Sequence, residues 1–388
     1  MKKDENRNSN NKKYSHHLVV SLMNQVIILS PLETESATIF CIIISTLLFV
    51  LVPYCYHYYF NIRSNNINES SKPSYNDTTM MSINPCPNPN CVRCQKYKQI
   101  QSSAKRRLPY LIHEWKNKER IRGNKMSCQL SQSSSLFQLQ RIVDGVHNDC
   151  ARSNSMNSFR SSGQYPTVLF VPRLLQPAPS IVTHLHEDAC HAFHKNISPT
   201  IKDVILQEYI DSQIKDAQWT KNIGTSSIGQ SNNKNDEDHL WEVLYLMNQG
   251  KWNQNNIQLY CPKTYSFISK KVNGLMEKCI FGNIFISVLY PGTKIEPHCG
   301  PTNIRHRLHY ALSVPDTKDN PLILKVRDEV LTWKEGEVFV FDDSLVHSAE
   351  FIDNNTTSEV RVVLVIDLWH PSLSLDERKL LSDLYPPL

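Results

Sequence analysis

Two histidines stand where the chain leaves predicted strands, and their side chains could bind a metal ion. His298 follows the strand Ile284–Tyr290 and a short turn segment, and His347 follows the strand Glu337–Phe341 and a second short segment. Imidazole nitrogens bind iron, copper or zinc, and two histidines with one carboxylate are the ligands of non-haem iron sites. The alternative is that both are ordinary members of the 15 histidines of the chain.

Basic side chains near these histidines are suited to binding an anion. Arg307 and His309 are two residues apart on a predicted strand, so their side chains point to the same face. Arg361 opens a run of apolar residues, and arginine binds a carboxylate through two parallel hydrogen bonds. Two separated cationic groups at one opening suit a dicarboxylic acid. The alternative is a salt bridge with Asp or Glu, which is weaker for Arg361 because burying it without an anion is costly.

The elements that must position these residues are mostly strands in the last third of the chain. Turn residues such as Pro291 and Gly292 separate the strands, which favours an antiparallel double-layered barrel or jelly roll. Trp241–Met247 is read as a helix or a strand. The predicted strands are Thr167–Val171, Ile284–Tyr290, Arg305–Val314, Leu322–Val326, Glu337–Phe341 and Val360–Leu368. The predicted helices are Gln95–Arg120, Leu136–Asp149, Ser180–Phe193, Ile201–Tyr209 and Thr264–Met276.

An uncharged apolar run near the N-terminus predicts a membrane anchor at residues 37–60. No charged residue lies between Glu35 and Arg63, and tyrosines follow the run, as at a membrane interface. The alternative is a buried core helix. Sequons beginning at Asn68 and Asn76 favour a type II single-pass protein with its C-terminal part in the lumen of the endoplasmic reticulum or secretory pathway. If the second apolar stretch Leu18–Leu32 also crossed, that part would face the cytosol.

The remaining organisation follows from composition. We expect a polar tail at 1–36, the anchor at 37–60, a polar stalk at 61–100, a helical and loop region at 101–160, and the main domain at 161–388. The stalk ends with Cys86, Cys91 and Cys94, whose spacing allows zinc, disulfides or free thiols. The net charge of +5 is spread along the chain, which gives no basis for a nucleic-acid partner.

Several ordered motifs resemble the core of the aspartyl/asparaginyl β-hydroxylase family. The first two are the run from His298 to His309, which reads HCGPTNIRHRLH, and the run from Trp333 to His347. Arg361–Pro371, Trp241–Gly250 and Cys261–Thr264 fit the same pattern. The resemblance covers roughly Pro166–Leu388. The anchor and stalk are similar to those of the β-hydroxylase domain-containing membrane proteins of this family.

The resemblance implies a fold, a chemistry and residue roles. The fold would be α+β to mainly β, a double-stranded β-helix (jelly-roll, cupin-like) catalytic domain with flanking helices, preceded by one transmembrane helix. The chemistry would be that of a dioxygenase using Fe(II), 2-oxoglutarate and O2 to hydroxylate Asp or Asn side chains of peptides or proteins. His298 and His347 would be the catalytic iron ligands. Ser287 and Arg361 would hold the distal carboxylate of 2-oxoglutarate, with Arg307 and His309 near its other end.

Two departures and three alternatives accompany this expectation. Gly300 stands where a usual iron site has Asp or Glu, although the family resembled also has Gly there. The segment between His347 and Arg361 is longer than the family pattern. The alternatives are a catalytically inactive membrane-anchored binding protein of dioxygenase fold, an interaction protein built on Cys86–Cys94, and an amino-acid hydroxylase on the same barrel.

Overall fold

The computed structural model describes residues 91–92, 95–123, 132–147, 163–174, 179–215, 217–222, 225–226, 241–315, 322–352 and 359–388. All of them belong to the compact unit Ile83–Leu388. The predicted anchor, Leu18–Leu32, Asn68, Asn76, Cys86 and Cys94 lie outside the described residues. Within these ranges, no helix combines the length and the apolar character that crossing a membrane requires. Zinc, disulfide and free-thiol states of the stalk therefore stay predictions.

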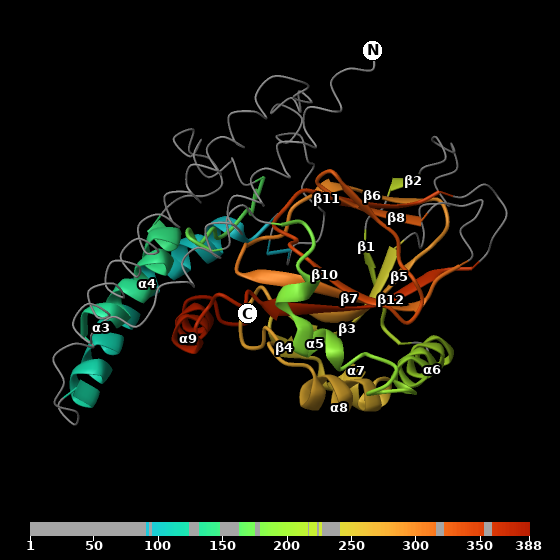
Figure 1. Ribbon diagram of the computed structural model, residues 1–388, viewed down its shortest axis with the longest axis horizontal. Coiled ribbons are helices and arrows are strands. Elements are labelled where there is room, and N and C mark those ends of the chain that lie inside the picture. The colour runs from blue at the N-terminus through green and yellow to red at the C-terminus, as the bar shows by residue number, and fades with distance from the viewer. Residues whose placement is uncertain are drawn as a thin grey trace, which may run out of the picture. The chain divides into compact units, whose positions relative to one another are not determined.

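Two antiparallel sheets form the centre of the domain and lie one above the other (Figure 1). The larger sheet has the order β1-β3-β5-β12-β7-β10, with β4 paired to β3, and the smaller has the order β2-β6-β11-β8-β9. The larger sheet consists of β1 (Thr220–Asn222), β3 (Trp241–Asn248), β4 (Lys251–Trp252), β5 (Ile284–Leu289), β7 (Arg305–Ser313), β10 (Val338–Phe341) and β12 (Arg361–Trp369). The smaller consists of β2 (Thr225–Ser226), β6 (Thr293–His298), β8 (Leu322–Val326), β9 (Glu329–Leu331) and β11 (His347–Phe351).

The space between the sheets is one hydrophobic core, and the outer face of the larger sheet is another. Strand β12 is buried along its whole length and pairs with β5 on one side and β7 on the other. Because successive side chains of a strand alternate between faces, Val363 and Val365 point between the sheets, whereas Leu364 and Ile366 point outward. Two stacked antiparallel sheets with helices outside agree with the predicted jelly-roll type of fold.

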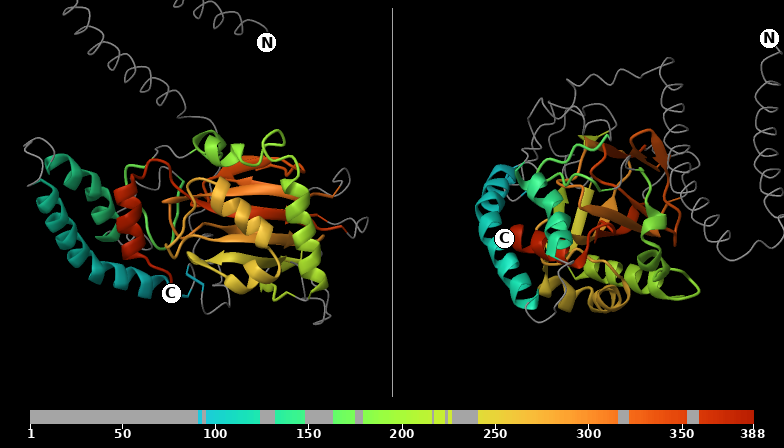
Figure 2. Two further views of the ribbon diagram at one scale, coloured as in Figure 1. Left: turned by 90° about the horizontal axis from the view of Figure 1, so that it is seen from below. Right: turned by 60° about the vertical axis from the view of Figure 1, so that its left-hand side comes forward.

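Helices α6 (Ile201–Ile214), α7 (Gln254–Leu259) and α8 (Pro262–Lys271) cover the outer face of the larger sheet, as Figure 2 shows from below. The buried Glu208 of α6 accepts hydrogen bonds from the backbone N–H groups of Lys263 and Thr264 at 2.8 and 2.9 Å. These donors have no partner within their own helix, and a carboxylate also suits the positive end of the helix dipole. Glu208 thereby ties α6 to the start of α8.

A third core joins helices from both ends of the described chain to one end of the sheets. Helices α3 (Tyr97–Gly123), α4 (Gln132–His147) and α9 (Leu375–Leu384) contact one another and bury apolar residues against Phe281, Ile304 and Trp369. Arg141 of α4 holds both carboxylate oxygens of Glu377 at 2.6 and 2.8 Å. Glu377 also completes a capping box with Ser374 at the start of α9.

The structure corrects several predicted elements. Thr167–Val171 is not a strand: apart from one bridge between Leu169 and Thr302, its N–H groups bind a loop rather than a sheet ladder. Ser180–Phe193 is not one helix but η3 (Thr183–Leu185) and α5 (Glu187–His191), because the buried His186 between them has non-helical dihedrals. Trp241–Met247 is a strand, since β1 and β5 pair with it on both sides.

Candidate active site between the sheets

All six residues predicted for the site line a single cavity between the sheets. Five strands supply them, namely β5, β6, β7, β11 and β12, and the residues are Ser287, His298, Arg307, His309, His347 and Arg361. Trp241, Trp333 and Phe341 line the same cavity, together with apolar residues of both sheets such as Leu324 and Val365. The structure thus brings together all six residues predicted to bind the metal or the cosubstrate.

The two predicted metal ligands are neighbours across the smaller sheet. His298 is the last residue of β6, His347 is the first of β11, and the two are paired in the strand register. Their ring centroids are 4.2 Å apart. Each ring has its Nδ1 within hydrogen-bonding distance of a backbone carbonyl two residues earlier, Glu296 at 2.8 Å and Leu345 at 2.9 Å.

These two contacts determine which ring nitrogen can bind a metal. A carbonyl oxygen only accepts hydrogen bonds, so Nδ1 carries the proton in both rings. In a neutral imidazole the lone pair then lies on Nε2. Metal-binding histidines usually have the second nitrogen held in this way, because it orients the ring and sets the tautomer. The pair therefore fits a metal ion bound through two Nε2 atoms.

A third protein ligand is absent from the described residues, which contain no group of three or more His, Cys, Asp or Glu arranged for a metal. Gly300 stands two residues after His298, and a Cβ built there would lie 2.5 Å from Oδ2 of Asp343. Asp343 is itself buried and ion-paired with Arg305. Burial alone would raise the pKa of Asp343, but Arg305 and Arg307 outweigh it and hold that pKa below its usual range. A side chain at position 300 would thus meet a carboxylate that Arg305 already binds.

Arg361 is a buried cation that has a hydroxyl as its partner instead of a carboxylate. Its Nη2 donates to Ser287 Oγ at 2.8 Å, and its guanidinium carbon lies 4.8 Å from the centre of the Trp333 ring. Its Nε is buried without a hydrogen-bond partner among the described residues. Burial lowers the pKa of Arg361 to about 9, and no carboxylate of the described residues opposes this effect. Such a group fits an anionic ligand, since an unpaired buried charge is costly.

His309 presents a neutral hydrogen-bond donor to the cavity. The indole N–H of Trp333 donates to its Nδ1 at 3.2 Å, so the proton of the ring lies on Nε2. The pKa of His309 is held well below its usual value by burial first, and then by the positive charges of Arg361 and Arg307. His309 therefore stays uncharged and can donate from Nε2 to an acceptor such as a carboxylate.

Arg307 behaves differently from Arg361, because it already has a carboxylate. Its Nε and Nη2 donate to the two oxygens of Asp367 at 2.8 and 3.1 Å. The salt-bridge alternative therefore holds for Arg307, although its side chain still lines the cavity. Burial opposes its charge, but Asp367 and Asp343 outweigh burial and raise the pKa of Arg307. It adds fixed positive charge beside His309.

Sequence reasoning named neither Trp241 nor Trp333 as site residues, and it did not connect Arg305 with Asp343. The Trp241 indole donates to Ser287 Oγ at 3.1 Å, so Ser287 is held by both Trp241 and Arg361. The alternation of β3 offered a signal for Trp241, because it shares a face with Val243, which points between the sheets. Nothing in the local sequence around Trp333 or Asp343 indicates their partners.

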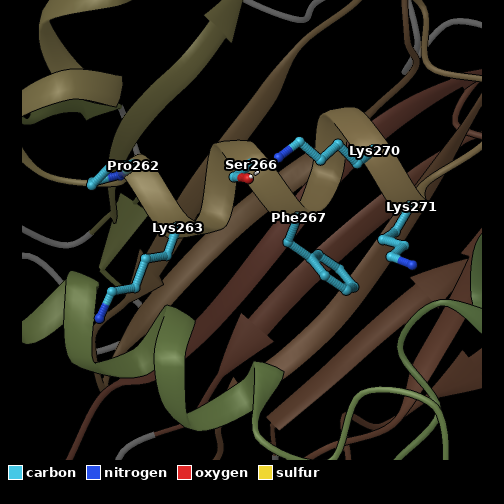
Figure 3. Close-up of a pocket in the computed structure, with 6 residues that line it drawn as sticks. All are labelled: Pro262, Lys263, Ser266, Phe267, Lys270 and Lys271. Carbon is cyan, nitrogen blue, oxygen red and sulfur yellow. Dashed lines mark hydrogen bonds between the residues drawn. The ribbon is translucent and has the colours of Figure 1, made fainter.

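A second hollow lies on the surface along α8 and contains none of the predicted site residues. It is lined by Pro262, Lys263, Ser266, Phe267, Lys270 and Lys271. Figure 3 shows that the three lysine side chains extend in different directions rather than toward one point. This surface lacks the convergent polar groups that mark a binding site.

The segment that carries the cavity is similar to a known protein family. Residues 203–371 match the family described as Aspartyl/Asparaginyl beta-hydroxylase. The chain is 41% identical over 151 residues to human Aspartate beta-hydroxylase domain-containing protein 2, and the match covers 38% of each protein. It is 36% identical over 141 residues to human Aspartyl/asparaginyl beta-hydroxylase, covering 36% of this chain and 17% of that protein. The predicted family resemblance is therefore confirmed over this segment, which spans well under half of either relative.

Among solved structures, a Pseudomonas putida prolyl-4-hydroxylase is similar over 44% of this chain and 87% of that chain, with 12% identity and a TM-score of 0.26.

Proposed function

From the match of residues 203–371 to the aspartyl/asparaginyl β-hydroxylase family, we propose that the protein is an Fe(II)- and 2-oxoglutarate-dependent dioxygenase. The observation that carries this proposal is the buried Arg361, whose Nε has no partner among the described residues, in the same cavity as the paired His298 and His347. The buried cation of Arg361 suits a carboxylate of 2-oxoglutarate, and the pair of histidines suits the metal ion that acts with this cosubstrate.

Fe(II) with 2-oxoglutarate and O2, when bound, supplies the oxidation, in which the cosubstrate becomes succinate and CO2 and a substrate C–H bond becomes C–OH. The residues of the chain bind the metal and the cosubstrate, orient them and exclude water from the cavity. His298 and His347 would hold the metal through Nε2. Arg361 would bind the distal carboxylate of 2-oxoglutarate through Nε and Nη2, with Ser287 fixing its position.

The remaining cavity residues would orient the other end of the cosubstrate and keep water out. His309 would donate from Nε2 to the second carboxylate, and Arg307 would add positive charge there while Asp367 holds it in place. Apolar side chains of the lining, among them Phe341 and Leu324, lower the local polarity and strengthen these interactions.

The substrate class and the cellular setting extend the same proposal. The names of the relatives refer to aspartyl and asparaginyl residues, which supports Asp or Asn side chains of peptides or proteins as the hydroxylated groups. The uncharged run at 37–60 supports a single membrane span, and the sequons at Asn68 and Asn76 support a type II orientation with the domain in the lumen of the secretory pathway. An amino-acid hydroxylase on the same barrel is the competing substrate assignment.

A catalytically inactive binding protein is the second candidate, favoured by one observation. Gly300 supplies no ligand, so the described residues offer two histidines for the metal, and a side chain at position 300 would meet Asp343. Such a protein would still bind metal and 2-oxoglutarate but would form no succinate.

The test is succinate formation by the full-length protein with Fe(II), 2-oxoglutarate and O2, with and without peptides that contain Asp or Asn. We expect succinate formation that is lost in His347→Ala and retained in Gln207→Ala, which changes an exposed residue of α6 far from the cavity. Stimulation by a peptide would identify the substrate class. Metal binding without any succinate would instead establish the inactive binding protein.

A further inference from the structure

A segment that precedes the family-matched region contacts both loops that carry the metal-binding histidines. Residues 163–174, here called the strap, run beside the loop 342–346, which leads into His347, and beside the loop 299–304, which follows His298. The strap lies outside residues 203–371, so the family match does not include it.

The first part of the strap holds the loop before His347. Gln164 forms a bridge with Leu345, and its side-chain amide donates to Oδ2 of Asp342 at 2.6 Å. The backbone N–H of Tyr165 donates to the carbonyl of Ser344 at 2.9 Å. Gln164 and the loop residues Asp342 and Ser344 are all buried. Buried hydrogen bonds of this kind are costly to lose, because each leaves an unsatisfied group.

The second part of the strap holds the loop after His298. The N–H groups of Val168 and Leu169 donate to the carbonyl of Pro301 at 2.9 and 3.1 Å. The fully buried Asn303 side chain accepts from the N–H of Val171 at 2.8 Å and donates to its carbonyl at 3.0 Å. The strap is therefore hydrogen-bonded to one histidine loop through Gln164 and Tyr165 and to the other through Val168–Val171.

Helices α3 and α4 support the strap from its other side. Gln101 of α3 donates to the carbonyl of Val168 at 2.9 Å. Gly145 of α4 approaches so closely that a Cβ there would lie 2.7 Å from the carbonyl oxygen of Phe170. Arg141 donates to the carbonyl of Arg173 at 3.1 Å. Displacing the strap from either helix would thus move the backbone that holds both loops.

We propose that the strap, held by α3 and α4, is a positioning element that sets the spacing and orientation of His298 and His347 for metal binding. The β6–β11 ladder aligns the two strands, but both histidines are terminal residues of their strands, where irregular loops begin. Binding a metal through two ligands requires both loops to be fixed relative to each other. This inference rests on the proposed two-histidine metal site.

The test measures Co(II) affinity and the visible absorption of bound Co(II) in the full-length protein without 2-oxoglutarate. Two variants act from opposite sides: Gln164→Ala removes the bond to Asp342, and Gly145→Ala pushes on Phe170 without touching either histidine loop. We expect each to raise the Kd for Co(II) by about tenfold, the lower end of the effect of outer hydrogen-bonding partners on metal sites. The Co(II) spectrum should change in both.

The Tm of the metal-free proteins separates positioning from loss of fold, because a purely structural defect lowers Tm and leaves affinity and spectrum unchanged in the folded fraction. Gln207→Ala, an amide truncation on α6, should retain wild-type affinity. Wild-type affinity and spectrum in both Gln164→Ala and Gly145→Ala would overturn the inference. If wild-type protein bound no Co(II), or bound it equally well as His298→Ala, the proposed metal site itself would be wrong and the inference would fail with it.

Discussion

Arg361 is the residue whose surroundings say most about the ligand of the cavity. Arg305 and Arg307 are also buried or nearly so, but each binds an aspartate. Arg361 instead donates a hydrogen bond to Ser287 and packs against the face of the Trp333 ring. Its Nε lacks a partner among the described residues. The difference indicates that Arg305 and Arg307 have structural ion pairs, whereas Arg361 has no carboxylate partner among the described residues.

Replacing Arg361 with Lys tests this assignment, because Lys keeps the charge and loses the two parallel donors. We expect the Kd for 2-oxoglutarate, measured by calorimetry with Mn(II) present, to rise by roughly 10- to 100-fold, since hydrogen bonds to charged groups contribute about 1.5–3 kcal/mol. Arg106→Lys, a matched change at an exposed position of α3, should leave this Kd unchanged. An unaltered Kd in Arg361→Lys would mean that another residue binds the carboxylate.

Gly300 leads to a second prediction at the same scale. Replacing Gly300 with Asp should not complete a three-ligand metal site, because its Cβ would meet the carboxylate of Asp343. We expect Gly300→Asp to lose about 1–3 kcal/mol of stability, as overpacked cores do, with no gain in Mn(II) affinity. Gly300→Ala should lose a similar amount of stability, measured by urea unfolding, because the Cβ atom alone already meets Asp343. Tighter metal binding at wild-type stability would show instead that a third ligand fits.

At the scale of elements, successive side chains of strand β7 alternate between the cavity and the opposite face of the sheet, and both faces carry polar residues. Arg307 and His309 face the cavity, whereas His306 faces the other way and meets His186 and His370. His186 Nε2 and His306 Nδ1 are 2.8 Å apart, and all three histidines are buried. The cluster joins the start of α5, the start of β7 and the end of β12, and it requires neutral rings.

The cluster predicts a loss of stability in acid. Burial is the largest cause that lowers the pKa of His186 to about 4, followed by Arg378 and His184. Burial is also the largest cause that lowers the pKa of His370 to about 3, followed by His186, Arg141 and Arg378. The pKa of His306 is lowered by burial and by the two neighbouring histidines, whereas Asp343 raises it. The unfolded chain therefore binds more protons than the folded one below pH 6.5, so this stability is complete above pH 6.5 and declines toward pH 4. In His186→Gln, the urea midpoint should fall less steeply over this window than in wild type. If the urea midpoint fell equally steeply with decreasing pH in both proteins, His186 would not contribute to the loss of stability in acid.

At the scale of the whole molecule, the cavity depends on a core that extends beyond the family-matched segment. The described helices α3, α4 and α9 cover Met276, Phe281, Ile304 and Trp369 at one end of the sheets. Figure 2 shows α3 and α4 beside α9 at that end. Residues 203–371 alone would expose this apolar surface, which water disfavours by about 25 cal/mol per Å².

We therefore expect a fragment of residues 203–371 to be aggregated or to unfold without cooperativity, whereas residues 83–388 unfold in a single cooperative transition. Thermal unfolding followed by circular dichroism, together with light scattering, distinguishes the two. A 203–371 fragment with the Tm of the longer piece would show that the helical core contributes nothing to the stability of the sheets.

The sequence by itself determined the residue types of the site and most of the strands around it. The period-2 alternation of β7 placed Arg307 and His309 on one face, and the apolar neighbours of Arg361 indicated that it is buried. The ordered motifs indicated the family. These features are local, so they can be read from neighbouring residues.

Only the tertiary structure decided which of these residues have partners. Arg361 and Ser287 are 74 residues apart, and Arg307 and Asp367 are 60 apart. Whether a cation meets a hydroxyl or a carboxylate at such a separation depends on strand register, and a slip of one residue turns every side chain to the opposite face. Asp343 approaches Gly300 closely, and the strap is hydrogen-bonded to both histidine loops. These contacts also join residues far apart in the sequence, which is why local sequence patterns could not predict them.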